Sequence, residues 1–213
     1  MTGWRLTVKP SSMRRLDIGI AGCGIGGLAA ALLLARDGHR ISLYERFEAP
    51  RPVGSGLIVQ PTGLAILDRL GLSGALVAAA APIERLLGKA EPSGRVVLDV
   101  RYAWLRRPGA VGYGVHRAAL FDILHRAVTA QGIPIRTGRT VSGLSAGRLR
   151  FAGGGSSPGH DLVVDALGST SPLAGEAARP PGRWPTGRCG RASTGWTAST
   201  NPRSSSATGR RAS

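Results

Sequence analysis

Residues 16–45 read LDIGIAGCGIGGLAAALLLARDGHRISLYE, and this stretch decides the fold of the chain. The short apolar run from Leu16 to Ala21 is typical of a buried strand. The alanines and leucines from Leu28 to Arg36 predict a helix that ends at Asp37-Gly38, because glycine accommodates the left-handed conformation that closes many helices. A second strand is expected from Arg40 to Glu45. The spacing therefore predicts a strand–helix–strand unit of about thirty residues.

A glycine-rich turn joins the first strand to the helix. Gly22, Gly24 and Gly27 satisfy the pattern G-x-G-x-x-G, which gains its value from lying between a strand and a helix. Gly22 permits the tight turn, Gly24 lets the backbone approach a pyrophosphate, and Gly27 lets the helix pack closely on the strand. The helix start offers unpaired N–H groups to phosphates, so Ile25 and Gly26 join the glycines as candidate cofactor-binding residues. The alternative is a glycine-rich helix start that binds no ligand.

An acidic residue ends the second strand. Glu45 follows Gly27 by eighteen residues, a spacing that places a carboxylate against a ribose hydroxyl in dinucleotide-binding units. An acid there favours a free 2′-hydroxyl and disfavours a 2′-phosphate. The glycines do not separate FAD from NAD, so an NAD-binding oxidoreductase domain stays open as an alternative.

The rest of the pattern predicts a mixed α/β order. Apolar residues at helical spacing predict further helices, and alternation predicts antiparallel strands around a turn at 91–94. The expected helices are 62–70, 72–81 and 117–130, and the expected strands lie within 82–100 and at 133–137, 140–144, 148–152 and 161–166. A nucleotide unit, inserted antiparallel strands and a return to the sheet indicate a Rossmann-like α/β domain.

Composition and charge exclude several classes of function. The 213 residues are 42% hydrophobic, enough for a packed core, and carry a formal net charge of +16. Seven arginines and one glutamate lie in residues 174–213, and the remaining charge is scattered, which argues against nucleic-acid binding. The apolar run 16–35 contains Asp17 and five glycines, so a membrane anchor is disfavoured and a cytoplasmic location is expected. Cys23 and Cys189 lie far apart and indicate neither a disulfide nor a metal site.

Three segments are expected along the chain. Residues 1–13 are polar and without period, and predict a flexible leader. Residues 14–173 make up the nucleotide-binding domain. Residues 174–213 contain no Leu, Ile, Val, Phe, Tyr or Met. Such a segment cannot bury enough apolar surface to offset a backbone entropy of roughly 1–2 kcal/mol per residue, so a disordered tail is expected.

Four blocks of sequence carry a resemblance to a known family. They are the nucleotide unit ending Leu43-Tyr44-Glu45-Arg46, the stretch GSGLIVQP at 54–61, VHRAAL at 115–120, and DLVVDALGSTS at 161–171. Together they make the stretch from Leu16 to Leu173 resemble the N-terminal part of the FAD-dependent aromatic hydroxylases, the flavoprotein monooxygenases similar to p-hydroxybenzoate hydroxylase. The resemblance implies FAD as the cofactor and residues 82–113 as part of a substrate sheet.

The resemblance also implies binding roles for single residues. Glu45 and Arg46 correspond to residues at the adenosine ribose, Gly56 to a loop that passes the flavin, Arg117 to an arginine on the cofactor, and Val141 to a backbone contact with adenine. Plainer interpretations stay open for three of them: Arg46 as a surface charge, Arg117 as a solvated residue that opens a helix, and Val141 as an ordinary core valine.

The implied activity is that of a monooxygenase. In the family, NAD(P)H reduces the flavin, O2 is activated on it, and an aromatic or polyketide-like small molecule is hydroxylated; the sequence itself nominates no catalytic acid, base or nucleophile. The block at 161–171 departs from the family, because Leu167 stands where the Asp of an Asp-Gly pair is usual and Asp165 replaces a glycine. The departure puts NAD(P)H handling, as a transient co-substrate, in question.

Members of this family are much longer than 213 residues. A truncated domain is therefore expected, with the tail a frameshifted reading of the missing half. An inactive remnant that binds FAD weakly or not at all is the corresponding alternative.

Overall fold

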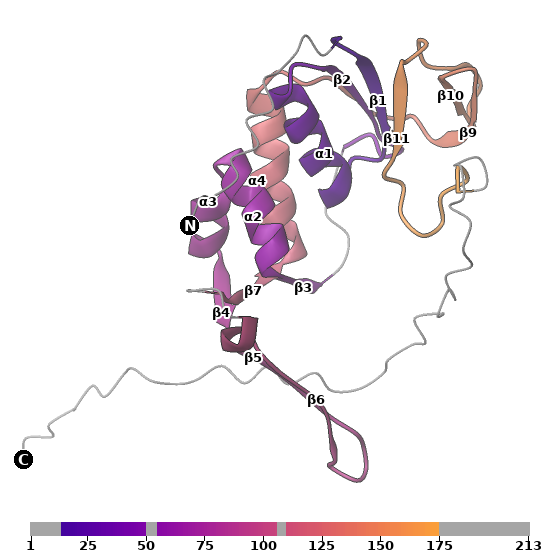
Figure 1. Ribbon diagram of the computed structural model, residues 1–213. Helices are drawn as coiled ribbons and strands as arrows, with labels where there is room; N and C mark the ends of the chain where they lie inside the picture. The colour runs from indigo at the N-terminus through magenta and orange to yellow at the C-terminus, as the bar shows by residue number, and fades with distance from the viewer. Residues whose placement is uncertain (1–13, 50–54, 106–109, 175–213) are drawn as a thin grey trace, which may run out of the picture.

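The computed structural model describes residues 14–49, 55–105 and 110–174 (Figure 1). The expected leader at 1–13, Gly54 of the second block and the expected tail beyond residue 174 lie outside the described residues.

A four-stranded parallel sheet forms the nucleotide-binding part of the chain. Its strands are β1 (Asp17–Ala21), β2 (Arg40–Tyr44), β8 (Ile135–Arg136) and β11 (Leu162–Asp165), in the order β11-β1-β2-β8. The chain runs outward from β1 to β2 and β8 and then returns to the other side of β1. In open sheets of this kind, ligands bind beyond the carboxyl ends of the strands, at the point where the order reverses. That point is the end of β1, where the glycine motif begins.

Two helices cover one face of this sheet and build the main core. The helix α1 (Ile25–Arg36) packs against β2 and against α4 (Arg117–Ala130), and Figure 1 shows the two helices side by side. The side chains of Ile18 and Ile20 are completely buried, as is that of Leu28 on α1. A strand covered on both faces needs apolar residues in succession, which explains the run from Ile18 to Ala21 in β1.

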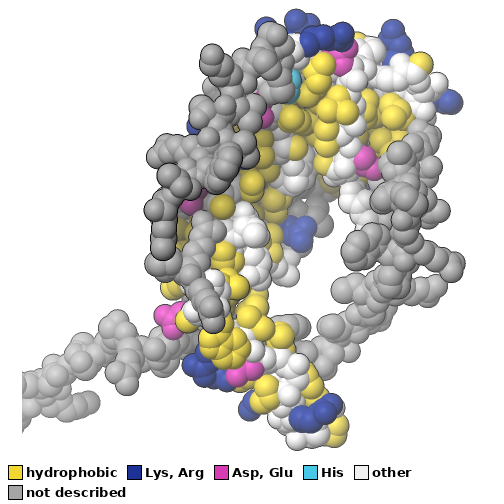
Figure 2. Space-filling model, viewed as in Figure 1, with side chains coloured by type: hydrophobic (Ala, Val, Ile, Leu, Met, Phe, Trp, Pro, Cys, Tyr) yellow, Lys and Arg dark blue, Asp and Glu magenta, His cyan; other side chains and the backbone are white. Residues whose placement is uncertain are grey.

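A second layer follows β2. The strands β3 (Gly56–Val59), β7 (Gly112–His116) and β4 (Ala80–Ile83) form an antiparallel sheet in the order β3-β7-β4, which lies beyond the helices α2 (Pro61–Leu70) and α3 (Ser73–Ala78). A hairpin of β5 (Arg85–Lys89) and β6 (Val96–Arg101), followed by the 3-10 helix η1 (Tyr102–Leu105), projects from this layer (Figure 1). Figure 2 shows apolar and basic side chains along the hairpin, where Val96 and Val97 are more than half exposed.

A third unit is the antiparallel hairpin of β9 (Val141–Ser145) and β10 (Arg148–Phe151). It encloses a smaller core with the end of the parallel sheet, made of Ala21, Tyr44, Val141, Leu149 and Leu173. Among the described residues, no helix has the length and apolar character that crossing a bilayer requires.

The fold agrees with the Rossmann-like α/β domain with inserted antiparallel strands that the sequence predicts, with local differences. The helix α1 begins at Ile25 rather than Leu28, and α3 ends at Ala78, where the expected helix continued to residue 81. Ala80 to Ile83 instead pair with β7, because Pro82 cannot donate within a helix but fits an edge strand. β11 lies within the strand expected at 161–166, and its Leu162 is 43% exposed because, within the described residues, β11 pairs only with β1.

Candidate functional site

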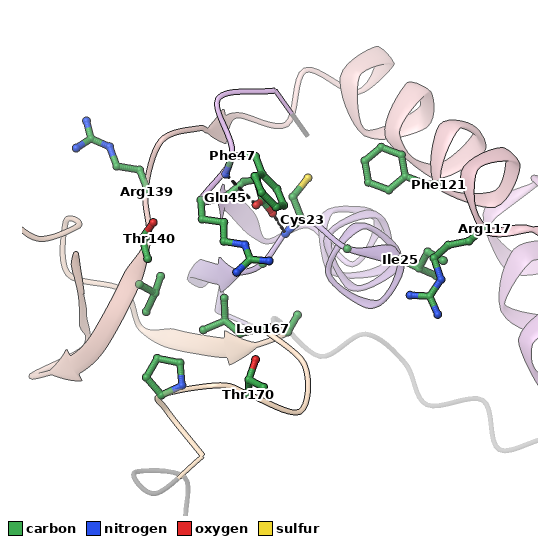
Figure 3. A pocket seen from close by; sticks show the side chains of 16 residues that line it. Cys23, Ile25, Glu45, Phe47, Arg117, Phe121, Arg139, Thr140, Leu167 and Thr170 are labelled. Carbon is green, nitrogen blue, oxygen red and sulfur yellow. Dashed lines mark hydrogen bonds between the residues drawn. The ribbon is translucent and has the colours of Figure 1, made fainter. Parts of the chain in front are cut away.

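A cavity of about 480 Å³ lies at the carboxyl ends of the parallel strands (Figure 3). Its wall is made by the glycine turn, the residues that follow β2, the approach to β9, the loop that follows β11, and the first turns of α4. In chain order, these segments contribute residues 22–25, 45–47, 117 and 121, 139–141, and 166, 167, 170 and 172. The site therefore lies where the reversal of strand order predicts a ligand.

The glycines of the turn divide into two pairs. Gly22 has φ +104° and passes the end of β11 so closely that a Cβ on it would lie 2.5 Å from the carbonyl oxygen of Ala166. A Cβ on Gly27 would lie 2.0 Å from the carbonyl oxygen of Gly22. At Gly24 and Gly26, however, a Cβ would meet no atom of the described residues within 4 Å. The fold itself thus requires Gly22 and Gly27, whereas the open space at Gly24, on the cavity wall, suits the close approach of a ligand.

The amino end of α1 faces this open space. Gly24 is the N-cap, and no side chain of the described residues caps the helix. The first N–H groups of an α-helix have no partner within it, and they carry the positive end of the helix dipole. With no acidic residue among the first-turn residues of α1, this helix start is suited to an anion such as a pyrophosphate.

Glu45 connects the glycine turn to the end of β2. The residue is 9% exposed. Its Oε2 accepts a hydrogen bond from the N–H of Cys23 at 2.9 Å, and Oε1 accepts one from the N–H of Phe47 at 3.1 Å (Figure 3). A carboxylate oxygen can accept more than one hydrogen bond. Glu45 therefore holds the turn and keeps acceptor capacity for a ligand hydroxyl.

The buried thiol of Cys23 lies in the same wall. Burial, and secondly the negative charge of Glu45, raise the pKa of the Cys23 thiol to about 12. At neutral pH this side chain is a neutral thiol that packs in the turn, not a nucleophilic thiolate.

Arginines dominate the charge of the cavity. Arg46, Arg117 and Arg139 belong to the lining, and Glu45 is the sole acidic residue among the described residues that form it. The guanidinium of Arg46 lies 4.6 Å from the ring centre of Phe47. Figure 3 shows Arg117 extending from the start of α4 toward α1, beside Ile25. This excess of positive charge attracts an anionic ligand.

Comparison with known proteins identifies the ligand class. A model of the FAD binding domain matches residues 15–148, which is more than half of the chain. The chain belongs to this FAD-binding family. The cofactor of this family is FAD, which decides between FAD and NAD, the two ligands that the glycine pattern left open. The cavity fits it, since the open glycine, the uncapped helix and the arginines suit a pyrophosphate.

Relatives of the FAD-binding chain include several monooxygenases. It is 31% identical to the aurachin C monooxygenase/isomerase of Stigmatella aurantiaca, over 78% of this chain and 44% of the relative. It is 34% identical to the 3-amino-4-hydroxybenzoate 2-monooxygenase of Streptomyces cremeus, over 73% of this chain and 40% of the relative. The chain thus spans less than half the length of the curated relatives it matches.

Solved structures share the fold. The tetrameric form of 2-methyl-3-hydroxypyridine-5-carboxylic acid oxygenase has a TM-score of 0.60 and 22% sequence identity, covering 71% of this chain and 39% of that one. CtdE in complex with FAD has a TM-score of 0.53 and 22% identity, covering 71% of this chain and 38% of that one.

The structure brings most of the predicted cofactor-binding residues to the cavity. Gly22, Gly24, Ile25, Glu45, Arg46, Arg117 and Val141 line it. Gly26 and Gly27 follow in the first turn of α1. Val141 is also buried in the smaller core, so its two interpretations are compatible.

Gly56 stands apart from the lining. It lies not in a loop but at the start of β3, where it pairs with His116 of β7. The preceding residue, Ser55, accepts a hydrogen bond on its carbonyl oxygen from the N–H of Arg117 at 2.9 Å. β3 thus supports the start of α4, and Gly56 neighbours the cavity without facing it.

Several lining residues were not predicted from the sequence. Arg139 and Thr140 follow β8, Leu167 and Thr170 follow β11, and Phe121 lies one turn into α4. The strand order places the ends of β8 and β11 at the same edge of the sheet as the glycine turn. The rule that carboxyl ends of parallel strands form the ligand site is the signal that would have found the residues after β8 and β11.

Proposed function

We propose that this chain binds FAD in the cavity at the end of β1 and is the nucleotide-binding part of a monooxygenase. The observation that carries the proposal is the pair of glycines at 24 and 26, which the packing of the described residues does not require. The uncapped start of α1 beside them would hold the pyrophosphate, and Glu45 would accept a hydrogen bond from the adenosine ribose. Arg46 and Val141 would lie at the adenosine, and Arg117 would add positive charge at the other end of the cavity.

The reaction class is supported by the relatives. Proteins about a third identical to this chain over the aligned stretch are named as monooxygenases, two of them of aurachin C and of 3-amino-4-hydroxybenzoate. We infer the same class here: O2-dependent hydroxylation of an aromatic or polyketide-like small molecule, with NAD(P)H as the transient reductant. Bound FAD supplies the redox chemistry. The residues of this chain bind the cofactor, orient it and exclude water from the pyrophosphate. The cytoplasmic location stays a prediction.

Titration of the flavin-free chain tests the proposal. We expect FAD to bind at one equivalent with quenching of its fluorescence, and ADP to compete, because the described lining residues surround the end of the sheet where the ADP half binds. FMN, which lacks that half, is the control and should not compete. Absence of FAD binding by folded protein, or equal competition by FMN, would overturn the assignment.

The reaction class needs its own measurement. The chain is loaded with FAD and mixed anaerobically with NADH or NADPH. The loss of absorbance is followed near 450 nm, at roughly the visible maximum of oxidised flavin. Reduction by either nucleotide supports the proposed reductant. A flavin that is reduced by dithionite but by neither nucleotide would overturn this part of the proposal while leaving FAD binding intact.

A further inference from the structure

The loop that follows β11 forms one wall of the cavity. Ala166, Leu167, Thr170 and Pro172 contribute to the lining. The loop begins where the N–H of Ala166 donates to the carbonyl oxygen of Ala21 at 2.8 Å. At its far end, the side chain of Leu173 is 3% exposed in the smaller core. The residues between these two ends need a further anchor to keep a fixed position against the cavity.

The carboxylate of Asp165 provides that anchor. Oδ1 accepts a hydrogen bond from the N–H of Leu167 at 3.0 Å, and Oδ2 accepts one from the hydroxyl of Ser171 at 2.6 Å. The Ser171 oxygen in turn accepts a hydrogen bond from the N–H of Leu173 at 3.0 Å. Hydrogen bonds to a charged acceptor are the stronger kind. One side chain outside the cavity thus links both ends of the loop.

The loop also lies directly against the glycine turn. A Cβ on Gly22 would be 2.5 Å from the carbonyl oxygen of Ala166 and 3.2 Å from the nitrogen of Leu167, the same N–H that Asp165 holds. No space separates the two segments. A shift of Leu167 therefore moves one wall of the cavity relative to the turn that faces the pyrophosphate.

We propose that Asp165 is a positioning residue for FAD: it holds residues 166–173 in the conformation that the bound cofactor needs. A loop already held in place loses little further conformational freedom on binding, which raises affinity. The inference rests on the proposed FAD site. The proposal also gives a role to Asp165, which stands where the family resemblance of residues 161–171 leads one to expect a glycine. Leu167, which stands in place of an expected aspartate, lines the cavity wall.

A purely structural role is the competing explanation, and β11 offers a matched control. Asp161 flanks the opposite end of the same strand, where its Oδ2 accepts a hydrogen bond from the N–H of Asp17 at 2.9 Å and its carboxylate pairs with Arg14. Both aspartates are exposed and both hold backbone. Loss of either weakens the attachment of β11, but only Asp165 contacts the cavity loop.

The experiment compares Asp165→Ala, Asp165→Asn, Ser171→Ala, the double variant Asp165→Ala/Ser171→Ala, and Asp161→Ala in the full chain. We expect Asp165→Ala to weaken FAD binding about tenfold and Ser171→Ala to weaken it less, because each removes hydrogen bonds that hold the loop. Asp165→Asn should bind FAD more tightly than Asp165→Ala and nearly as tightly as the wild-type protein, since the amide oxygen still accepts a hydrogen bond from the N–H of Leu167. The double variant of Asp165 and Ser171 should be no weaker than Asp165→Ala. Asp161→Ala should lower the melting temperature and leave the Kd for FAD within about twofold.

Amide hydrogen exchange of the flavin-free protein gives a second readout. Asp165→Ala should speed exchange at Leu167 and Leu173, and Asp161→Ala should not. The proposal is overturned if Asp165→Ala leaves affinity and exchange unchanged, or if Asp161→Ala weakens FAD binding equally. Wild-type protein that binds no FAD overturns the proposed function instead, and the exchange of the two amides still decides whether Asp165 anchors the loop.

Discussion

The carboxylate of Glu45 accepts a hydrogen bond from the backbone N–H of Cys23, 2.9 Å away, and so joins the end of β2 to the glycine turn at the end of β1. The same carboxylate binds the N–H of Phe47. An acid that the dinucleotide pattern assigns to the ligand is thus also part of the turn that binds the ligand's phosphates. Its two roles make separate demands on the side chain.

Substitution of Glu45 should reveal both roles. Glu45→Ala leaves the buried N–H of Cys23 and the part-buried N–H of Phe47 without their acceptor, and we expect a loss of about 2–4 kcal/mol in the free energy of unfolding. Glu45→Gln keeps an acceptor oxygen and should lose less stability, yet it should weaken FAD binding about tenfold because the charged acceptor for the ribose is gone. Urea denaturation and FAD titration measure the two effects. The exposed Glu48, three residues on, is the control, and a Glu48→Ala variant that behaves like Glu45→Ala would contradict the prediction.

The two pairs of glycines predict opposite phenotypes. Gly22→Ala should destabilise the fold by about 2–3 kcal/mol, because φ is +104° and the methyl group would meet the carbonyl of Ala166. Gly24→Ala should change stability by less than about 1 kcal/mol, since φ is −79° and the space is open. It should nevertheless weaken FAD binding at least about tenfold, because the methyl group occupies the space of the approaching pyrophosphate.

Gly74 supplies the control for these glycine variants. It lies in α3, away from the cavity lining, and a Cβ there would also meet no described atom within 4 Å. Gly74→Ala should leave the Kd for FAD unchanged. If Gly24→Ala binds FAD as tightly as Gly74→Ala does, the assignment of the glycine turn to the pyrophosphate is wrong.

The spacing of apolar residues along the sequence predicts an element correctly where that element buries one continuous face. The helix at 117–130 has its predicted bounds, because its apolar residues recur at helical spacing and Leu120, Leu124 and Val128 are buried together. The start of α1 was missed because glycines at 26 and 27 are poor helix formers. The helix nevertheless includes Gly27, because it passes so close to the carbonyl of Gly22 that no side chain would fit there.

Elements that depend on distant contacts escaped prediction. β7 contains Gly112 and Gly114, residues that argue against a strand. A Cβ on Gly112 would lie 2.5 Å from the hydroxyl oxygen of Tyr102, so the glycine makes room for a ring from η1. The cavity residues Arg139 and Leu167 were missed for a related reason: their place follows from the order of strands in the sheet, which no local spacing reveals.

A chain of hydrogen bonds centred on the buried His160 predicts a large stability effect. His160, whose side chain is 1% exposed, places Nδ1 2.7 Å from Oδ1 of Asp17 and Nε2 3.0 Å from the hydroxyl oxygen of Tyr44. Its ring fits because residue 19 is glycine, where a Cβ would lie 2.5 Å from Cδ2 of the ring. His160→Ala should therefore cost about 2–4 kcal/mol, from the lost packing and the unpaired polar groups.

A double-mutant cycle tests this contact directly. Gly19→Ala should destabilise the wild-type protein by about 1–3 kcal/mol through overpacking, and it should cost much less in the His160→Ala background, where the ring is absent. Denaturant unfolding of the four proteins gives the coupling energy. Additive losses would show that Gly19 and His160 do not contact each other as described. His125→Ala, at a partly exposed position on α4, should lose less stability than His160→Ala.

The thiol of Cys23 predicts a loss of stability at alkaline pH. Its pKa is raised from 9.0 to about 12, chiefly by burial, so the folded chain holds the thiol proton more tightly than the unfolded chain does. The resulting stabilisation is complete below pH 9 and is lost as the pH rises from 9 toward 12. Urea unfolding at pH 7.5 and 9.5 should show a larger drop for the wild-type protein than for Cys23→Ala, both in a Cys189→Ala background. Burial also raises the pKa of Tyr44 above 10.0, so the folded chain keeps most of this phenol protonated even at pH 9.5, and Tyr44 is present in both proteins. Equal drops in the two proteins would mean that the Cys23 thiol titrates alike in the folded and unfolded chains.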